Sequence, residues 1–259
     1  MTKTFRGAIC LCLVGLLFLS AFLDFVFRIW IWRRATTRAR AEWMTFWARV
    51  FLRILNAKVT VRGHPPTSGL LVSNHLSYVD VLIYGSIFPV ILLSKSEVRN
   101  WPVIGGLTRI AGTLYIRRES KSDVVSLSQD MAKVVDEGMV VAVFLEGTSS
   151  GGETVLPFRS SLLAPAEEHR WPVTASWIHY ELPGGSAADE VCYWRDMTFF
   201  PHLFNLLGRR GFHAFVSFDE PLTEKLNRKE MARALHSRVC RLKDEFLAQE
   251  KPRGPLPAK

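Results

Sequence analysis

The chain has 259 residues, enough for one α/β domain with a short accessory segment, and its four cysteines form no C-x-x-C pair that would indicate a disulfide framework or a zinc site. Residues 1–62 carry the whole net charge of +9, because they hold eleven Lys and Arg against two acids, Asp24 and Glu42. A nucleic-acid-binding protein would spread its basic residues over the folded domain, so this distribution argues against that class and favours an anionic lipid surface.

The first predicted element is an apolar N-terminal helix. Residues 7–23 carry no charge, and the apolar stretch continues to the aromatic cluster Trp30–Trp32, which is barely long enough to span a bilayer. A cleaved signal peptide is the alternative, but no small-residue cleavage site follows, so we expect a retained membrane anchor. More basic residues follow the helix than precede it, which predicts a cell-membrane protein with the following domain on the cytoplasmic face. They are Arg33, Arg34, Arg38 and Arg40 after the helix, and Lys3 and Arg6 before it.

A second helix is predicted to begin at Thr36 or Thr37. Its apolar residues recur three and four positions apart and form one aromatic face, while arginines occupy other positions. Such a helix typically lies in the membrane interface, and the alternative is that its apolar face packs on the domain as core. The apolar residues are Trp43, Phe46, Trp47, Val50, Phe51, Ile54 and Leu55. We therefore assign residues 1–57 to a membrane anchor and an interfacial amphipathic helix.

From residue 58 onward, short β-rich runs alternate with helical stretches, which predicts an α/β fold with a mixed sheet flanked by helices. The predicted strands are Lys58–Val61, Leu70–Ser73, Val90–Ser94, Thr113–Ile116, Met139–Leu145, Val173–Ile178, Val191–Trp194 and His213–Phe218. The predicted helices are Tyr78–Phe88, Val103–Ala111, Asp123–Glu137, roughly Ser160–His169, and Lys225–Glu250. We expect residues 58–250 to form one catalytic domain and residues 251–259 a disordered tail.

The segment SNHLSYVD follows a predicted strand and contains His75 and Asp80. A spacing of five does not place two residues on one helical face, but it suits a His just outside a helix that begins between them. With Ser77 as the N-cap, Asp80 falls in the first turn, from which its carboxylate reaches back to the imidazole. A carboxylate in that place fixes the tautomer of a catalytic His, although a loop His without function is the alternative.

A second segment, residues 95–118, combines glycines with Lys95 and Arg118. This suits anion binding, because glycine lets the backbone approach closely and a guanidinium can form two hydrogen bonds to one phosphate. A solvated basic face is the alternative.

In a third segment, an apolar strand leads to Glu146, Gly147 and Thr148. The residues that follow complete a G-x-S-x-G sequence around Ser149, which raises a serine esterase as a rival function. A nucleophile elbow must turn directly from strand into helix, whereas here the chain continues as GETVLP, a poor helix start.

The order NHLSYVD, GTLYIRR, FLEGT and WPVTAS resembles the phospholipid and glycerol acyltransferase family, which includes the 1-acylglycerol-3-phosphate acyltransferases. The resemblance covers about residues 56–220. It implies that His75 is the general base, that Asp80 orients it, and that the donor is acyl-CoA or acyl-carrier protein, with no metal or other cofactor. It also implies that the acceptor is bound by Arg118, Glu146 and Gly147. We add Lys95, Thr148 and Arg159 as further candidates for acceptor binding.

The chain also departs from the family pattern. The F-P-E-G-T-R sequence reads FLEGTS here, with Leu145 for the proline and Ser149 for the basic residue, and PFRSSL follows. These features look like the branch of the family that acylates lyso-ornithine lipids. From the family resemblance we expect acyl transfer to the 2-hydroxyl of lysophosphatidate, giving phosphatidate for phospholipid biosynthesis. The departures make a lyso-ornithine lipid the alternative acceptor. A serine esterase and a non-catalytic lipid-binding membrane protein are the remaining alternatives.

Overall fold

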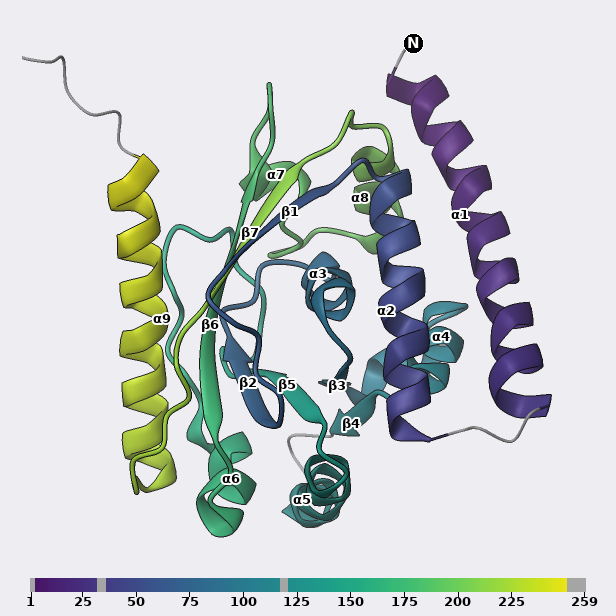
Figure 1. Cartoon of the computed structure of the whole chain (residues 1–259). Coiled ribbons are helices and arrows are strands. Elements are labelled where there is room, and N and C mark those ends of the chain that lie inside the picture. The colour runs from purple at the N-terminus through teal and green to yellow at the C-terminus, as the bar shows by residue number, and fades with distance from the viewer. Residues whose placement is uncertain (1–2, 32–35, 117–120, 251–259) are drawn as a thin grey trace, which may run out of the picture.

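The computed structural model describes residues 3–31, 36–116 and 121–250, and within them seven strands form one central sheet (Figure 1). The strand order is β1-β7-β6-β2-β5-β3-β4, with β6 antiparallel to β7 and the other neighbouring pairs parallel. The strands are β1 Lys58–Arg62, β2 Gly69–Ser73, β3 Val90–Lys95, β4 Leu114–Ile116, β5 Val140–Phe144, β6 Val173–Glu181 and β7 His213–Phe218. The predicted mixed α/β fold is thus confirmed.

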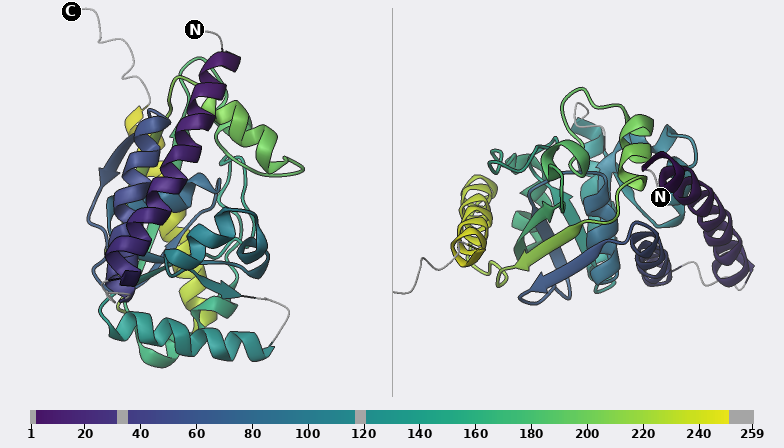
Figure 2. Two further views of the ribbon diagram at one scale, coloured as in Figure 1. Left: turned by 90° about the vertical axis from the view of Figure 1, so that its right-hand side faces the viewer. Right: turned by 90° about the horizontal axis from the view of Figure 1, so that it is seen from above.

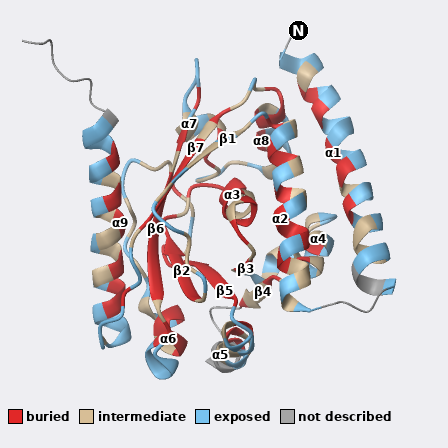
Figure 3. Cartoon of the chain, viewed as in Figure 1, coloured by how far each residue is buried: buried red, intermediate tan, exposed pale blue. Residues whose placement is uncertain are grey.

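The helices cover both faces of this sheet, as two views of the molecule show (Figures 1 and 2). One apolar core lies between the sheet and α1, α2, α3 and α8, and a second lies between the sheet and α5, α6 and α9. The helices are α1 Lys3–Phe25, α2 Thr37–Ile54, α3 Val79–Ile87, α4 Ile104–Ile110, α5 Lys121–Asp136, α6 Ala164–His169, α7 Ala187–Glu190, α8 Phe199–Leu207 and α9 Arg228–Glu250. Since β2 and β5 are buried on both faces, their sequences GLLVS and VVAVF are almost continuously apolar (Figure 3).

Two features of the region between β6 and β7 differ from the sequence prediction. The predicted strand Val191–Trp194 is wrong, because this segment is a loop that follows α7. Its apolar character comes from Val191 and Cys192, which are buried in the first core, and the N–H of Tyr193 pairs with the carbonyl of Leu76 outside the sheet. The short helices α7 and α8 were not predicted.

Helix α1 packs lengthwise on the domain through one stripe of residues. The stripe comprises Gly7, Cys10, Val14, Leu17 and Ala21, spaced three and four apart, and it faces α2 and α8. The opposite side exposes large apolar side chains, such as Leu16 and Leu19, which are 62% and 56% exposed. The helical segment Lys3–Arg28 is the one stretch among the described residues that is long and apolar enough to cross a membrane. An apolar helix with this outer face indicates membrane association.

Helix α2 begins as predicted, with the hydroxyl of Thr36 accepting a hydrogen bond from the N–H of Ala39. Most of its aromatic face belongs to the core, where Trp43 and Phe51 are buried. Phe46 is 54% exposed. Most of this face therefore packs on the domain as core, which was the alternative to an interfacial helix. Phe46 is the main side chain of this face that is free to contact the membrane interface.

Two arginines of α2 also bind the domain. Arg49 donates to the carbonyl of Ser86 (2.7 Å) at the end of α3, and Arg40 donates to the carbonyl of Arg109 (3.1 Å) at the end of α4. Cations in these places satisfy carbonyls that a helix leaves unpaired at its C-terminus.

Candidate active site

The predicted site residues gather at one edge of the sheet. Strands β2, β5, β3 and β4 are parallel neighbours, so their carboxyl ends meet at the same edge. His75 lies two residues beyond β2, Glu146 lies two residues beyond β5, and Lys95 is the last residue of β3. The crevice outside the carboxyl ends of parallel strands is the usual binding region of an open α/β sheet.

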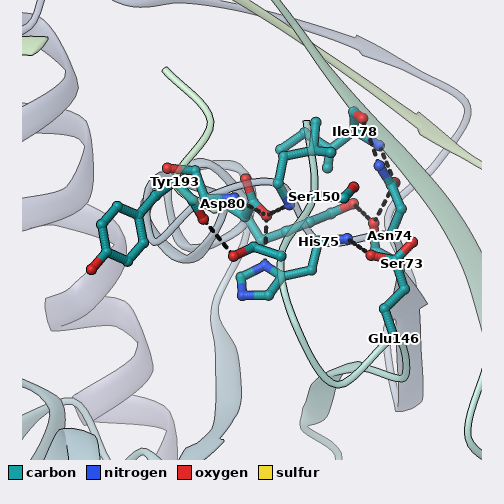
Figure 4. A network of polar contacts seen from close by, with 12 residues as sticks. Ser73, Asn74, His75, Asp80, Glu146, Ser150, Ile178 and Tyr193 are labelled. Carbon is teal, nitrogen blue, oxygen red and sulfur yellow. Dashed lines mark hydrogen bonds and ion pairs between the residues drawn. The ribbon is translucent and has the colours of Figure 1, made fainter. Parts of the chain in front are cut away.

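Asn74 lets the main chain leave the sheet just before His75. Its side-chain amide donates to the carbonyl of Ile178 (3.0 Å), and its Oδ1 accepts from the N–H of Ile178 (2.9 Å), as Figure 4 shows. The side chain thereby takes the place of a backbone neighbour for β6. This role was not predicted, and its only signal in the sequence is a polar residue at the end of an apolar strand.

His75 and Asp80 form the pair that the sequence predicts. The Nδ1 atom of His75 lies 2.7 Å from Oδ2 of Asp80, which is fully buried, while the side chain of His75 is 23% exposed. An ionised carboxylate only accepts hydrogen bonds, so Nδ1 carries the hydrogen and Nε2 keeps a free lone pair. The pair therefore presents an oriented base at a partly open position.

The helix start between these two residues differs in detail from the prediction. Helix α3 begins at Val79, and no side chain caps it, so Ser77 is not the N-cap residue. The hydroxyl of Ser77 is buried without a hydrogen-bond partner among the described residues. The N–H groups of Leu76 (2.7 Å) and Ser77 (3.1 Å) instead donate to Oδ2 of Asp80, because the chain turns tightly around the carboxylate.

Tyr180 holds the second carboxylate oxygen of Asp80. Its hydroxyl donates to Oδ1 at 2.6 Å, and both side chains are almost completely buried. Tyr180 was not predicted as a site residue, because it lies 100 residues further along the chain, on β6.

Glu146 joins the loop that carries His75 to the loop that carries Leu156. One oxygen accepts from the N–H of His75 (2.9 Å), and the other accepts from the N–H of Leu156 (2.8 Å). The side chain is only 4% exposed, and this burial raises the pKa of Glu146 to about 7. Both oxygens are thus engaged with main chain, which favours a part in shaping the site over direct contact with the acceptor.

Two further contacts fix His75. Its ring stacks on Phe144, with centroids 4.1 Å apart, and its carbonyl accepts from the N–H of Ser150 (2.9 Å). Gly147 follows Glu146 with a φ of 80°, a conformation that favours glycine and lets the chain turn back towards His75.

The other predicted binding residues are less enclosed. Lys95, Thr148 and Arg159 are exposed, and the N–H of Arg159 donates to the carbonyl of Leu145 (2.9 Å) just beyond β5. Lys95 ends a strand two positions from β2, which corresponds to roughly 10 Å across the sheet. Arg118 lies outside the described residues. The binding roles of all four residues stay predictions.

Ser149 lacks the setting of a nucleophile. Its hydroxyl donates to the carbonyl of Tyr193, and residues 147–159 contain no helix. The first helical residue after it is Ser160, in a 3-10 turn. The structure therefore gives no support to a nucleophile elbow.

An aromatic cluster adjoins the segment that carries His75 and Asp80. Tyr78 packs edge-on against Tyr193 and Phe199, and its hydroxyl lies 3.0 Å from Nδ1 of His202. His202 also lines an open cavity of about 700 Å³ between the N-terminus of α1 and the start of α8, with Lys3 on its wall. This grouping could not be predicted from local sequence patterns, because α8 itself was not predicted.

Comparisons with known proteins agree with this geometry. Residues 58–179 match the Acyltransferase family. The chain is 34% identical over 206 residues to a lyso-ornithine lipid O-acyltransferase of Pseudomonas aeruginosa, covering 78% of this chain and 79% of that protein. It is 30% identical over 139 residues to a 1-acyl-sn-glycerol-3-phosphate acyltransferase of Neisseria meningitidis, covering 50% of this chain and 54% of that protein.

The fold is also that of a solved structure. The crystal structure of the 1-acyl-sn-glycerophosphate (LPA) acyltransferase from Thermotoga maritima superposes with a TM-score of 0.67 and 18% identity, covering 95% of each chain. Together with the oriented His75–Asp80 pair, these similarities show that the chain belongs to the acyltransferase family that includes the lyso-ornithine lipid and 1-acylglycerol-3-phosphate acyltransferases.

Proposed function

We propose that this acyltransferase moves a fatty acyl group from a thioester donor to the hydroxyl of a lyso-ornithine lipid, with His75 as the general base. The observation that carries the proposal is the geometry of the base. Nδ1 is bound to the buried carboxylate of Asp80 at 2.7 Å, so Nε2 is the nitrogen left to accept a proton. The acyl donor is acyl-CoA or acyl-carrier protein, and the reaction needs no metal or other cofactor.

The reaction follows from this arrangement. As the acceptor oxygen attacks the thioester carbonyl, its proton passes to Nε2 of His75, and Asp80 stabilises the resulting imidazolium. A carbon–oxygen bond forms, the carbon–sulfur bond breaks, and the leaving thiolate takes the proton from the imidazolium. General-base assistance of this kind contributes a factor of roughly 10² to 10⁴.

Sequence similarity supports the choice of acceptor. Four relatives that are named lyso-ornithine lipid O-acyltransferases match 74% to 80% of the chain, whereas the Neisseria 1-acylglycerol-3-phosphate acyltransferase matches 50%. Ser149 stands where the phosphate-binding family pattern has a basic residue, which also favours an acceptor without a phosphomonoester. Lysophosphatidate, the acceptor that the motifs put first, is the second candidate, and the presence of Arg118 in the sequence favours it.

The membrane supplies the acceptor in this proposal. Because α1 lies along the domain, its exposed apolar side would enter the lipid layer while the catalytic edge stays close to the lipid headgroups. The proposed location of the domain is the cytoplasmic face, and the arginines around residues 33–40 support it through the positive-inside rule.

The test uses the full chain in detergent micelles with radiolabelled acyl donor. Lyso-ornithine lipid and lysophosphatidate are compared by kcat/KM, each with acyl-CoA and with acyl-carrier protein. We expect higher kcat/KM with lyso-ornithine lipid and none with His75→Ala. A preference for lysophosphatidate would reject the proposed acceptor, and activity in His75→Ala would reject the proposed base.

A further inference from the structure

Tyr180 and Asp80 form a short contact between two central elements of the fold. The phenol on β6 donates to Oδ1 of Asp80 on α3 at 2.6 Å, the length of a hydrogen bond to a charged acceptor. Burial raises the pKa of Tyr180 well above its ordinary value, so the hydroxyl keeps its hydrogen and acts as a donor throughout the working pH range.

The two oxygens of Asp80 have different partners. Oδ2 accepts from Nδ1 of His75 and from the N–H groups of Leu76 and Ser77, and the described donor to Oδ1 is the phenol of Tyr180. Asp80 is completely buried, so an unpaired Oδ1 would be costly.

Strand β6 binds both ends of the segment from Asn74 to Asp80, which contains His75. The backbone of Ile178 binds the side chain of Asn74, and Tyr180, two residues later and on the same side of the strand, binds Asp80. The Tyr180 ring is itself fixed edge-on against Phe212, with centroids 5.6 Å apart. One rigid strand therefore sets the separation between the residue before His75 and its carboxylate partner.

We propose that Tyr180 is a positioning residue for acyl transfer, whose hydroxyl holds and partly neutralises the Asp80 carboxylate that orients His75. This rests on the proposed function, in which His75 is the base. Since Tyr180 is buried behind Asp80, it acts on the reaction through Asp80 and not by touching either substrate.

The test compares Tyr180→Phe with Tyr84→Phe. Tyr84 is a matched control, because it is equally buried near Asp80 but its hydroxyl binds Ser73 and Ser176 instead. We expect Tyr180→Phe to lower kcat about tenfold, with KM for both substrates within about twofold of wild type. Because the unshielded carboxylate then stabilises the imidazolium more, the acidic limb of the kcat/KM profile should move to higher pH, and Tyr84→Phe should leave it in place.

Other ionisable groups near His75 and Asp80 do not affect the comparison of Tyr180→Phe with Tyr84→Phe. Glu146 faces His75 and Asp80 from the loop after β5, and Cys192 faces Asp80 from the loop after α7. Both are present in the two variants, so their titration cancels between them. A Tyr180→Phe profile that coincides with that of Tyr84→Phe, or moves to lower pH, would overturn the proposal.

A second measurement covers the case in which Tyr180→Phe does not fold. Fluorotyrosine at position 180 keeps the shape of the tyrosine side chain and donates a stronger hydrogen bond to Asp80. The acidic limb of the kcat/KM profile should therefore move to lower pH, and an unchanged limb would again overturn the proposal. His75→Ala separates the two hypotheses. If it stays active, the proposed base is wrong; if it is inactive while Tyr180→Phe behaves like Tyr84→Phe, only the role of Tyr180 is wrong.

Discussion

Replacing Glu146 with Gln should remove a pH dependence from the stability of the fold. The carboxylate is 4% exposed and accepts hydrogen bonds from the N–H groups of His75 and Leu156. Burial outweighs these two favourable contacts and raises the pKa to about 7, from an ordinary value of 4.5. Because the folded protein then holds the proton more tightly than the unfolded chain, the contribution of Glu146 to stability is greatest below about pH 4.5 and is lost as the pH rises towards 7.

The size of the effect follows from the two pKa values. A difference of roughly 2.5 units between folded and unfolded states corresponds to about 3 kcal/mol of unfolding free energy at pH 8. Gln cannot ionise, so this contribution is missing from the variant. Gln also presents an NH₂ group to one of the two backbone donors, which costs about 1–3 kcal/mol at every pH. The variant should therefore be less stable than wild type at pH 5 and regain about 2–3 kcal/mol relative to it at pH 8.

The measurement is denaturant unfolding of the full chain in mild detergent at pH 5 and pH 8. Glu153→Gln is the control, because Glu153 lies on the same loop but is exposed, and it should show no such change with pH. If the stability difference between wild type and Glu146→Gln were the same at both pH values, the buried-carboxylate reasoning would be refuted.

Three other predictions concern activity and membrane binding. His75→Ala and Asp80→Asn should each lower kcat at least about a hundredfold, while Ser149→Ala keeps most activity; loss confined to Ser149→Ala in a transfer assay would reverse the assignment. Arg118→Ala should raise KM strongly for lysophosphatidate and little for lyso-ornithine lipid. Arg118→Lys should bring KM for lysophosphatidate only part of the way back to the wild-type value, because an ammonium cannot form the bidentate contact. Equal KM changes for both acceptors would contradict a phosphate-binding role. Deleting residues 1–34 uncovers the apolar face of α2, so the shortened protein should still float with lipid vesicles. If the shortened protein were fully soluble at low salt, this face of α2 would not bind lipid.

Local patterns in the sequence were enough to predict most elements and the central pair of the site. The apolar run of β5 and the alternation of strands and helices follow from side-chain periodicity, which depends only on neighbouring residues. His75 and Asp80 could be paired for the same reason, since a helix start between residues five apart brings them together.

Packing between distant segments decided the rest. The aromatic face of α2 has the same sequence pattern whether it faces lipid or protein, and only the assembled fold shows α1 and α3 covering it. The binding role of Glu146 stays a prediction, and only the fold shows that both its oxygens accept hydrogen bonds from backbone N–H groups. Tyr180 meets Asp80 across 100 residues because β6 is inserted next to β2, an order of strands that no local pattern encodes. The hydrogen bond between the two side chains thus depends on tertiary packing alone, and the buried surroundings strengthen it.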